Sequence, residues 1–344
     1  MKKYAIILSL LLSSLLPACG HHHGGGSSPP SPAPNPAAYT YTATVVAQAQ
    51  PGFFSCAWNN GLYMGTYQDY DHKGHCYLCK LEGNRVVRLH TFPGESIYNI
   101  RSYPGYLMLP VEQGALWRYD IGGGYSITHP KHLRMGHYDF AWTPSGWVTS
   151  EKETITSQNR SQLWKNGQLL YETSEYTWKE FVFYKGKIYP ASYYIHHRTE
   201  GGLVEVNPET GEARLVYSQV GTHCFCNGID SLGRLLYALQ HGASATIRTL
   251  QGPIQEVPDI PWRIKTIKNT MTTFMLAAEH GWRKGGPCYL YVLNTNNGLF
   301  EKKLQLPDAE PWDICQGPSG NQFYLVTRNE KEGNLGRVYL VERH

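Results

Sequence analysis

Charged side chains are scarce in this sequence of 344 residues. They make up 17% of the chain, below the roughly 25% that is common in soluble domains, and the formal net charge is only +4. A nucleic-acid-binding surface needs a dense basic patch, and a nearly neutral chain offers none. We therefore expect no nucleic-acid partner.

Long helices and general disorder are also poorly supported. The chain contains 35 Gly and 21 Pro, and aromatic residues make up 13% of it. Scattered Gly and Pro interrupt helices, whereas abundant aromatic side chains can form a core. The length exceeds the usual prior of about 150 residues per domain, but a closed all-β architecture can use it as one unit.

The first nineteen residues have the pattern of an export signal. Lys2 and Lys3 precede an apolar run over residues 4–16, which has the length of a secretory h-region and is too short to span a bilayer. The run ends in Leu16-Pro17-Ala18-Cys19, which resembles the lipobox of bacterial lipoproteins, although Ala or Ser is commoner at the position of Pro17. The resemblance implies cleavage before Cys19 and a lipid on its thiol. The alternative is an ordinary leader with a chance cysteine.

Residues 19–38 are predicted to be a flexible tether. They contain a three-histidine run at 21–23 followed by Gly, Ser and Pro, with no apolar periodicity. Gly20 after the cysteine resembles lipoproteins that are sent to the outer membrane. We therefore expect a signal peptide over 1–18, a tether over 19–38 and a folded domain over 39–344, exported and anchored to the cell envelope.

Seven cysteines remain after Cys19. An exported protein meets an oxidising compartment, so pairs can form, but the odd number leaves at least one unpaired within the chain. Cys76 and Cys79 have the spacing of a zinc knuckle or redox pair, but the segment 76–81 alternates like a strand and no second pair follows. We predict a strand there, and no metal site or cofactor, although residues alone leave a divalent metal open. The seven are Cys56, Cys76, Cys79, Cys224, Cys226, Cys288 and Cys315.

From residue 39 onward, one unit recurs seven times. Each unit opens with an aromatic residue and a polar or small one, continues as a hydrophobic strand and reaches a turn, usually with Gly. The starts lie about 43 residues apart, and a period of about 40–45 with four strands is typical of β-propellers. We predict an all-β, seven-bladed β-propeller of four-stranded antiparallel blades. The opening pairs are Phe54-Ser55, Tyr98-Asn99, Tyr138-Asp139, Trp178-Lys179, Phe225-Cys226, Trp262-Arg263 and Trp312-Asp313.

The last unit reaches His344 after only three strands. Its missing outer strand is available near the other end of the chain, where residues 39–46 alternate well. Pairing of this segment with the strand near 338–342 would complete the last blade and remove the open seam between first and last blades. We predict this closure.

One blade resembles known propeller families. The segment Asn227-Gly228-Ile229 with the following Gly233-Arg234-Leu235 is similar to a blade of gluconolactonase/regucalcin-like and NHL-type propellers. In the lactonases this Asn binds the catalytic divalent metal, with an Asp after the second strand. Here Asn227 matches, but Gln240-His241 stands where the Asp would be. The resemblance covers one blade of seven and implies the architecture rather than the activity.

The loops that enter the inner strands of a propeller share one face. The residue after each entry aromatic should therefore ring the central opening, where charges could stay hydrated and bind a polar ligand. The residues two positions on include small ones, as a narrowing channel needs: Ala57, Arg101, Ala141, Phe181, Gly228, Lys265 and Cys315. Propeller channels also carry polar rings without a ligand. The predicted ligand-binding residues, one of them at a second-strand exit, are Asn99, Asp139, Lys179, Arg263, Asp313 and Arg328.

Two classes of function fit this pattern. The first is a lipid-tethered propeller that binds a glycan or a protein with this face, and the absence of a recognised catalytic motif favours it. The second is a polysaccharide-active enzyme. A lyase needs a His or Tyr as base and acid and a cation for the uronate carboxylate, whereas a glycosidase could use Glu112, Glu151 or Glu279. The candidate catalytic residues are Tyr193, His196, His197, His241 and His280.

Overall fold

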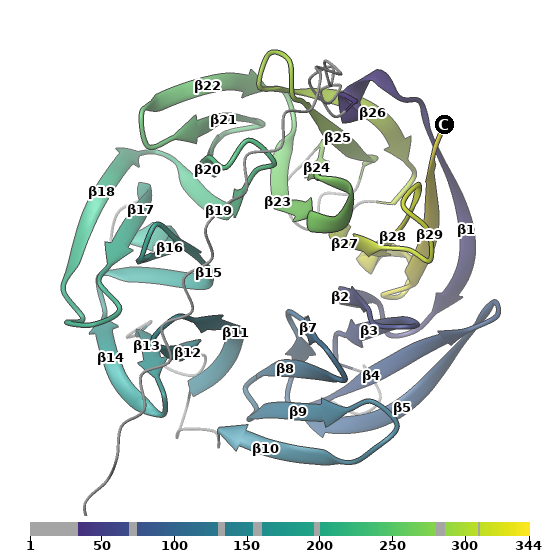
Figure 1. Cartoon of the computed structure of the whole chain (residues 1–344), viewed down its shortest axis with the longest axis horizontal. Helices are drawn as coiled ribbons and strands as arrows, with labels where there is room; N and C mark the ends of the chain where they lie inside the picture. The colour runs from purple at the N-terminus through teal and green to yellow at the C-terminus, as the bar shows by residue number, and fades with distance from the viewer. Residues whose placement is uncertain are drawn as a thin grey trace, which may run out of the picture. The chain divides into compact units, whose positions relative to one another are not determined.

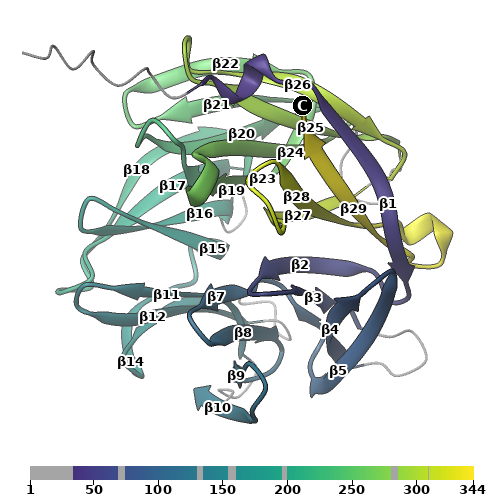
Figure 2. The ribbon, with the colours of Figure 1, turned by 45° about the vertical axis from the view of Figure 1, so that its right-hand side comes forward.

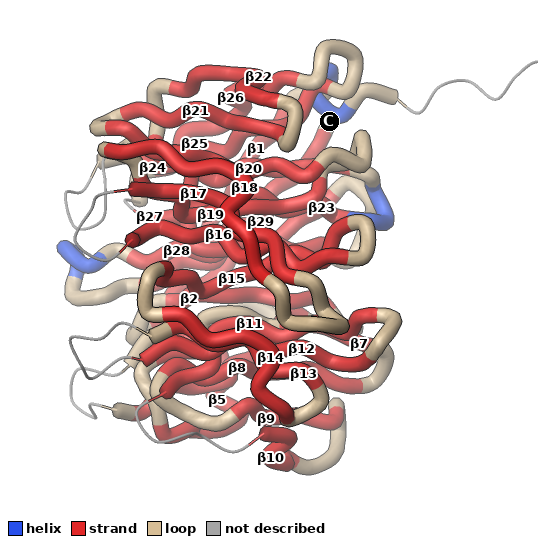
Figure 3. Tube along the Cα trace, turned by 90° about the vertical axis from the view of Figure 1, so that its left-hand side faces the viewer, coloured by secondary structure: helices blue, strands red, loops and turns tan. Residues whose placement is uncertain are grey.

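The computed structural model describes residues 34–68, 74–129, 135–153, 160–195, 200–279, 286–308 and 310–344. Seven antiparallel sheets follow one another around a ring, each running from an inner strand near the centre to an outer strand at the perimeter (Figure 1). In the described ranges, helix occurs only as the short 3-10 turns η1 (Pro36–Ala38), η2 (Lys268–Thr270) and η3 (Glu330–Glu332) (Figure 3). The predicted seven-bladed β-propeller is confirmed.

The first three blades are built from consecutive strands. Blade 1 consists of β2 (Phe53–Trp58), β3 (Leu62–Thr66), β4 (His75–Glu82) and β5 (Arg85–Pro93). In blade 2 the inner strand is interrupted, and its parts β6 (Ser96–Ile97) and β7 (Arg101–Tyr103) both pair with β8 (Tyr106–Glu112), followed by β9 (Leu116–Asp120) and β10 (Tyr125–His129). Blade 3 consists of β11 (Met135–Thr143), β12 (Gly146–Glu153), β13 (Ser161–Lys165) and β14 (Gln168–Thr173).

The next three blades repeat the same order. Blade 4 consists of β15 (Tyr176–Tyr184), β16 (Lys187–Ile195), β17 (Glu200–Val206) and β18 (Ala213–Val220). Blade 5 consists of β19 (His223–Ile229), β20 (Leu235–His241), β21 (Ser244–Thr249) and β22 (Gly252–Val257). Blade 6 consists of β23 (Ile260–Ile267), β24 (Thr272–Ala278), β25 (Cys288–Asn294) and β26 (Leu299–Leu306).

Blade 7 joins the two ends of the folded unit. It consists of β27 (Glu310–Gln316), β28 (Gln322–Arg328), β29 (Gly336–Arg343) and, as its outer strand, β1 (Tyr41–Ala49). The two last strands are antiparallel, with register from Tyr41 opposite Arg343 to Ala49 opposite Gly336, and they lie side by side in Figure 2. The predicted closure is confirmed.

The segment before β1 has partners in the folded unit, which runs from Asn35 to His344. The side-chain oxygen of Asn35 accepts hydrogen bonds from the backbone N–H groups of Ala37 and Thr295, and the hydroxyl of Tyr41 donates to the carbonyl of Pro36. Residues 35–38 therefore contact the propeller.

The core lies between neighbouring blades, and the cysteines are part of it. Cys76 and Cys79 lie on β4, as predicted, but three residues of strand place them on opposite faces, in two different hydrophobic clusters. They therefore cannot hold one metal ion together. All seven cysteines after Cys19 fall within described segments, are buried, and form no disulfide there.

The inner strands share a local irregularity at the entry aromatic. In blades 1, 3, 5, 6 and 7 the pairing register shifts so that this one residue is extra relative to the second strand; the skipped residues are Phe54, Tyr138, Phe225, Trp262 and Trp312. Such a β-bulge places two residues opposite one and re-aims their side chains. In blade 4 the register shifts twice, between Thr177 and Trp178 and between Trp178 and Phe181, so the residues without a partner follow the entry aromatic.

No helix in the described part of the chain has the length and apolar character needed to cross a membrane.

Candidate functional site: a polar ring on the inner strands

The entry aromatics of five blades form one cluster where the inner strands begin. Phe54 stacks on Trp312 with ring centroids 3.9 Å apart, and Trp262 lies 4.8 Å from Trp312. Tyr98 contacts Phe54 at 6.2 Å and Tyr138 at 5.5 Å. The cluster thus links blades 6, 7, 1, 2 and 3. Next to it lies a ring of polar side chains, the polar ring, whose members on these blades include residues that follow the entry aromatics by one position.

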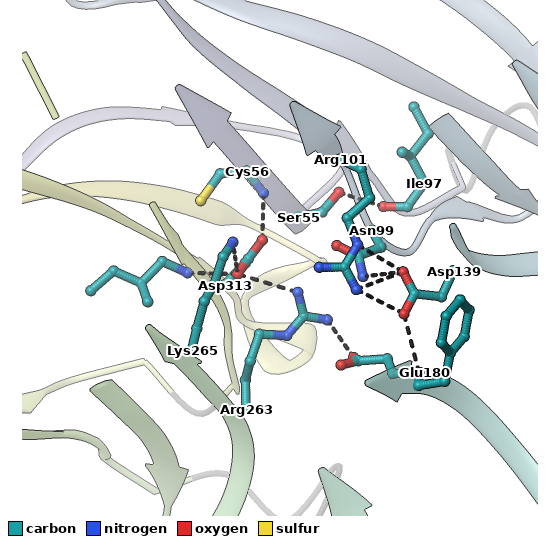
Figure 4. Close-up of polar contacts among 12 residues, drawn as sticks. Ser55, Cys56, Ile97, Asn99, Arg101, Asp139, Glu180, Arg263, Lys265 and Asp313 are labelled. Carbon is teal, nitrogen blue, oxygen red and sulfur yellow. Dashed lines mark hydrogen bonds and ion pairs between the residues drawn. The ribbon is translucent and has the colours of Figure 1, made fainter. Parts of the chain in front are cut away.

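The first half of the polar ring is centred on Asp139 of blade 3 (Figure 4). Its carboxylate accepts hydrogen bonds from the Asn99 amide at 3.0 Å and from Nε and Nη2 of Arg101 at 2.9 and 2.8 Å. It also accepts from the backbone N–H groups of Phe140 at 2.8 Å and Phe181 at 3.2 Å. One carboxylate therefore ties blades 2, 3 and 4 together.

The second half is centred on Asp313 of blade 7. Lys265 Nζ lies 2.8 Å and Arg263 Nη1 3.2 Å from its Oδ1, and the backbone N–H of Cys56 donates to Oδ2 at 3.0 Å. Arg263 also reaches Glu180 of blade 4 with Nη2, at 2.6 Å (Figure 4). The group therefore connects blades 6, 7 and 1 and crosses to blade 4.

The charges in the ring shift one another's pKa values. Burial acts to raise the pKa of Asp313, but Lys265 and Arg263 outweigh it, so this pKa is lowered. Burial raises the pKa of Glu180 despite its contact with Arg263. Burial opposes the charge on Arg263, yet Glu180 and Asp313 raise its pKa. Three cations and three carboxylates thus form a balanced network.

The structure brings four of the predicted ring residues together, but it does not leave them hydrated as the sequence analysis expected. Asn99, Asp139, Arg263 and Asp313 are all buried, and the Arg263 side chain is only 5% exposed. They are buried because each charge finds an opposite charge or a backbone N–H on another blade, which offsets the loss of water.

Solvent reaches two other cations of the same network. The side chain of Arg101 is 35% exposed and that of Lys265 is 27% exposed, whereas their partners Asp139 and Asp313 have no exposed side-chain surface. Both cations lie two residues after a ring position on the same strand, among the positions that the sequence analysis expected to line a narrowing channel. This two-residue spacing was the sequence signal that could have identified Arg101 and Lys265 as site residues.

Blade 4 differs from the prediction by one residue. Because the register of β15 shifts between Trp178 and Phe181, Glu180 takes the ring position that the pattern assigned to Lys179. The side chain of Lys179 lies outside what the structure describes. The bulge decides this position, and the aromatic-polar pair at Trp178-Lys179 gave no sign of it.

Arg328, also predicted to bind ligand, supports the aromatic cluster. It is buried, its Nε donates to Glu310 at 2.7 Å and its Nη2 lies 3.2 Å from Glu330. Its guanidinium lies over the rings of Tyr67 and Phe54, 4.7 and 5.1 Å from their centroids. Cation–π contacts of this kind stabilise packing at the entry.

Among the candidate catalytic residues, the structure describes the side chain of His241 alone. His196, His197 and His280 lie outside the described residues, as does the side chain of Tyr193. His241 contacts Thr246 at 2.6 Å and Glu256 at 3.5 Å, which belong to the outer strands of its own blade.

Two of the three carboxylates considered for a glycosidase, Glu112 and Glu151, have other partners. Glu112 accepts from Ser96 at 2.7 Å and from the Tyr138 hydroxyl, and Glu151 lies against His129 and His137. No described contact joins the two as an acid–base pair.

Asn227, the residue that matches the lactonase metal ligand, connects two blades. Its amide nitrogen donates to the backbone carbonyl of Tyr189 in blade 4 at 2.6 Å, and the residue is buried. The described contact of Asn227 is therefore a packing contact between blades 4 and 5.

Comparisons with known proteins show the fold. No family model matches the sequence, and no curated protein matches it. Among solved structures, the chain is similar to a streptogramin B lyase (TM-score 0.62, 13% identity, 88% of this chain and 98% of that one). It is similar to an oligogalacturonate lyase from Vibrio parahaemolyticus (0.56, 13%, 88% and 97%) and to the Pan2 WD40 domain of Neurospora crassa (0.56, 11%, 87% and 95%). At this identity the likeness establishes a β-propeller and carries no activity over to this chain.

Proposed function

We propose that this chain is an exported, lipid-anchored β-propeller that binds an acidic oligosaccharide through Arg101 and Lys265. The observation that carries the proposal is the pairing of each partly exposed cation with a fully buried carboxylate, Asp139 for Arg101 and Asp313 for Lys265. A buried carboxylate fixes the direction of the cation while the other side of the cation meets solvent.

Arg101 and Lys265 each have N–H donors that their carboxylate partners do not use. Arg101 uses Nε and Nη2 on Asp139, and Lys265 places its Nζ against Asp313. An arginine has five N–H donors and a lysine has three, so both keep donors for a ligand carboxylate. Because their side chains are already held, binding loses less side-chain entropy than it would with a flexible surface lysine.

The position of the cations favours a slender ligand. Both stand on inner strands, β7 and β23, rather than on outer strands or perimeter turns. An oligosaccharide chain can follow such a line of groups more easily than the flat surface of a folded protein can. The partly buried rings of Tyr67 and Trp262 at the entry side offer apolar faces for sugar rings.

The anchor part of the proposal rests on the sequence. Leu16-Pro17-Ala18-Cys19 supports acylation of Cys19, which would hold the propeller at the envelope, in the outer membrane according to Gly20. Metabolic labelling with a palmitate analogue should mark the wild type and not a Cys19→Ser variant. Equal labelling of both would show that the leader is an ordinary one.

The binding test compares two double variants of the full chain. Arg101→Gln with Lys265→Gln removes the two ring cations, and the control Arg118→Gln with Lys303→Gln removes one cation from an outer part of each of the same two blades. Loss of charged contacts to an anionic ligand should cost about 2 kcal/mol or more, which is about 30-fold in affinity. We expect this loss for uronate oligosaccharides in the first variant only. Because that variant also removes partners of the buried Asp139 and Asp313, its melting temperature should fall, and binding is measured well below the midpoint of each variant.

The result can separate the alternatives. Equal binding by both variants would exclude the ring cations as the site. Binding of an acidic peptide in place of every oligosaccharide would change the ligand class. Growth of ultraviolet absorbance from an unsaturated uronate product would establish the lyase alternative.

A further inference from the structure

A second cluster of chemical groups lies between blades 2 and 3. His129 is the last residue of β10, the outer strand of blade 2, whereas His137 and Glu151 stand on β11 and β12 of blade 3. His137 and Glu151 are cross-strand partners, so the register of blade 3 fixes them side by side. None of the three belongs to the polar ring.

The distances fit the coordination sphere of a metal ion. His129 Nε2 lies 3.2 Å and His137 Nδ1 lies 3.4 Å from Oε1 of Glu151, and the three residues each offer a ligand atom within 4.8 Å of the other two. Zinc bonds of about 2.0–2.1 Å at tetrahedral angles place ligand atoms about 3.3–3.4 Å apart. The two contacts made by Glu151 therefore already have the spacing of two edges of such a tetrahedron.

The surroundings are built and largely dry. His137 and Glu151 are buried, as is His129. The indole rings of Trp147 and Trp164 pack on His129 with centroids 5.6 and 5.5 Å away. A buried carboxylate between two imidazoles in an apolar shell binds a cation strongly, because no water competes for the charge.

We propose that His129, His137 and Glu151 bind a divalent transition metal, Zn²⁺ by the ligand set, which ties the outer strand of blade 2 to blade 3. Two imidazoles and one carboxylate are a common zinc ligand set and leave one coordination position. The site is independent of the proposed ligand site, since the two share no residue. One of its ligands, His129, belongs to blade 2, whose inner strand is interrupted.

The test uses the full chain in which His21, His22 and His23 are each replaced by Ser, because this run can itself bind metal. After treatment with a chelator and its removal, ZnCl₂ is titrated calorimetrically, and CoCl₂ is followed by visible absorption and by quenching of tryptophan fluorescence. We expect one metal ion per chain, a visible band of four-coordinate cobalt, and quenching through Trp147 and Trp164.

Matched variants locate the site. Glu151→Gln and His129→Gln should weaken zinc binding at least about tenfold. Their controls should not: Glu82→Gln changes an exposed carboxylate, and His90→Gln changes a half-buried histidine of blade 1 that stacks on Tyr125 of blade 2. Near-ultraviolet circular dichroism in the presence of chelator checks that each variant is folded. If Glu151→Gln does not fold, His129→Gln, which changes a residue at the edge of the cluster, provides the test.

Two outcomes would overturn the proposal. If the background chain binds no zinc stoichiometrically, the three side chains form only a hydrogen-bonded group. If the cluster variants and the controls bind zinc equally, the metal lies elsewhere.

Discussion

Replacement of Asp313 by Asn tests whether the polar ring holds the blades together. The substitution keeps the shape of the side chain and removes one charge that faces Lys265, Arg263 and the backbone N–H of Cys56. The new amide NH₂ must face at least one of these donors, so a buried donor loses its partner. Breaking a buried ion pair from one side costs about 3–5 kcal/mol.

The expected change in melting temperature follows from the size of the folded unit. Roughly 310 residues, Asn35–His344, at about 2.1 cal/mol/K per residue have an unfolding entropy of about 0.65 kcal/mol/K. A loss of 3–5 kcal/mol therefore lowers the midpoint by about 5–8 °C. The control is Asp120→Asn, which breaks an exposed pair with Arg118 and should change stability by less than about 1 kcal/mol.

The pH dependence gives a second check. The pKa of Asp313 is lower in the folded state, through Lys265 and Arg263, than the unfolded value of about 3.9. Its contribution is therefore fully present above the unfolded pKa and is lost as the pH falls through the folded one. The gap between wild type and Asp313→Asn should be widest near neutral pH and narrow below about pH 4. A midpoint within 1 °C of the Asp120→Asn control near neutral pH would refute the structural role of the ring.

Two further predictions concern the closure and the cysteines. Deletion of residues 39–46 removes most of β1 and exposes the edge of β29, so the thermal midpoint should fall by several degrees or more. Deletion of residues 24–31, the control, should leave the midpoint unchanged. Equal midpoints in the two monodisperse proteins would mean that β1 does not close the ring. Burial raises the pKa of Cys79 and Cys224 to about 12. An alkylating reagent at pH 8 should therefore leave these thiols unmodified in the native chain and modify them after unfolding, as counted by mass spectrometry. Rapid modification of the native chain would show that the thiols are accessible.

The blade architecture could be read from the sequence because its signals are local. Aromatic entries, alternating strands and Gly turns recur within each unit of about 43 residues, and each unit forms its own sheet. Closure by β1 followed from counting strands in the last unit, because an unpaired edge strand is unfavourable in any ring. The same repeat predicted that one side of the ring would gather Asn99, Asp139, Arg263 and Asp313.

The partners of these residues were decided only in three dimensions. Arg263 meets Glu180 across the ring, 83 residues away in the chain, and nothing in the spacing of either residue indicates the other. Glu180 enters the ring because the register of β15 shifts after Trp178, and the aromatic-polar pattern of the sequence does not indicate that shift. His129 reaches Glu151 because two sheets meet there. Repeats and periodicity therefore determine which strands form and in what order, whereas burial and ion pairing depend on distances between blades that no local pattern encodes.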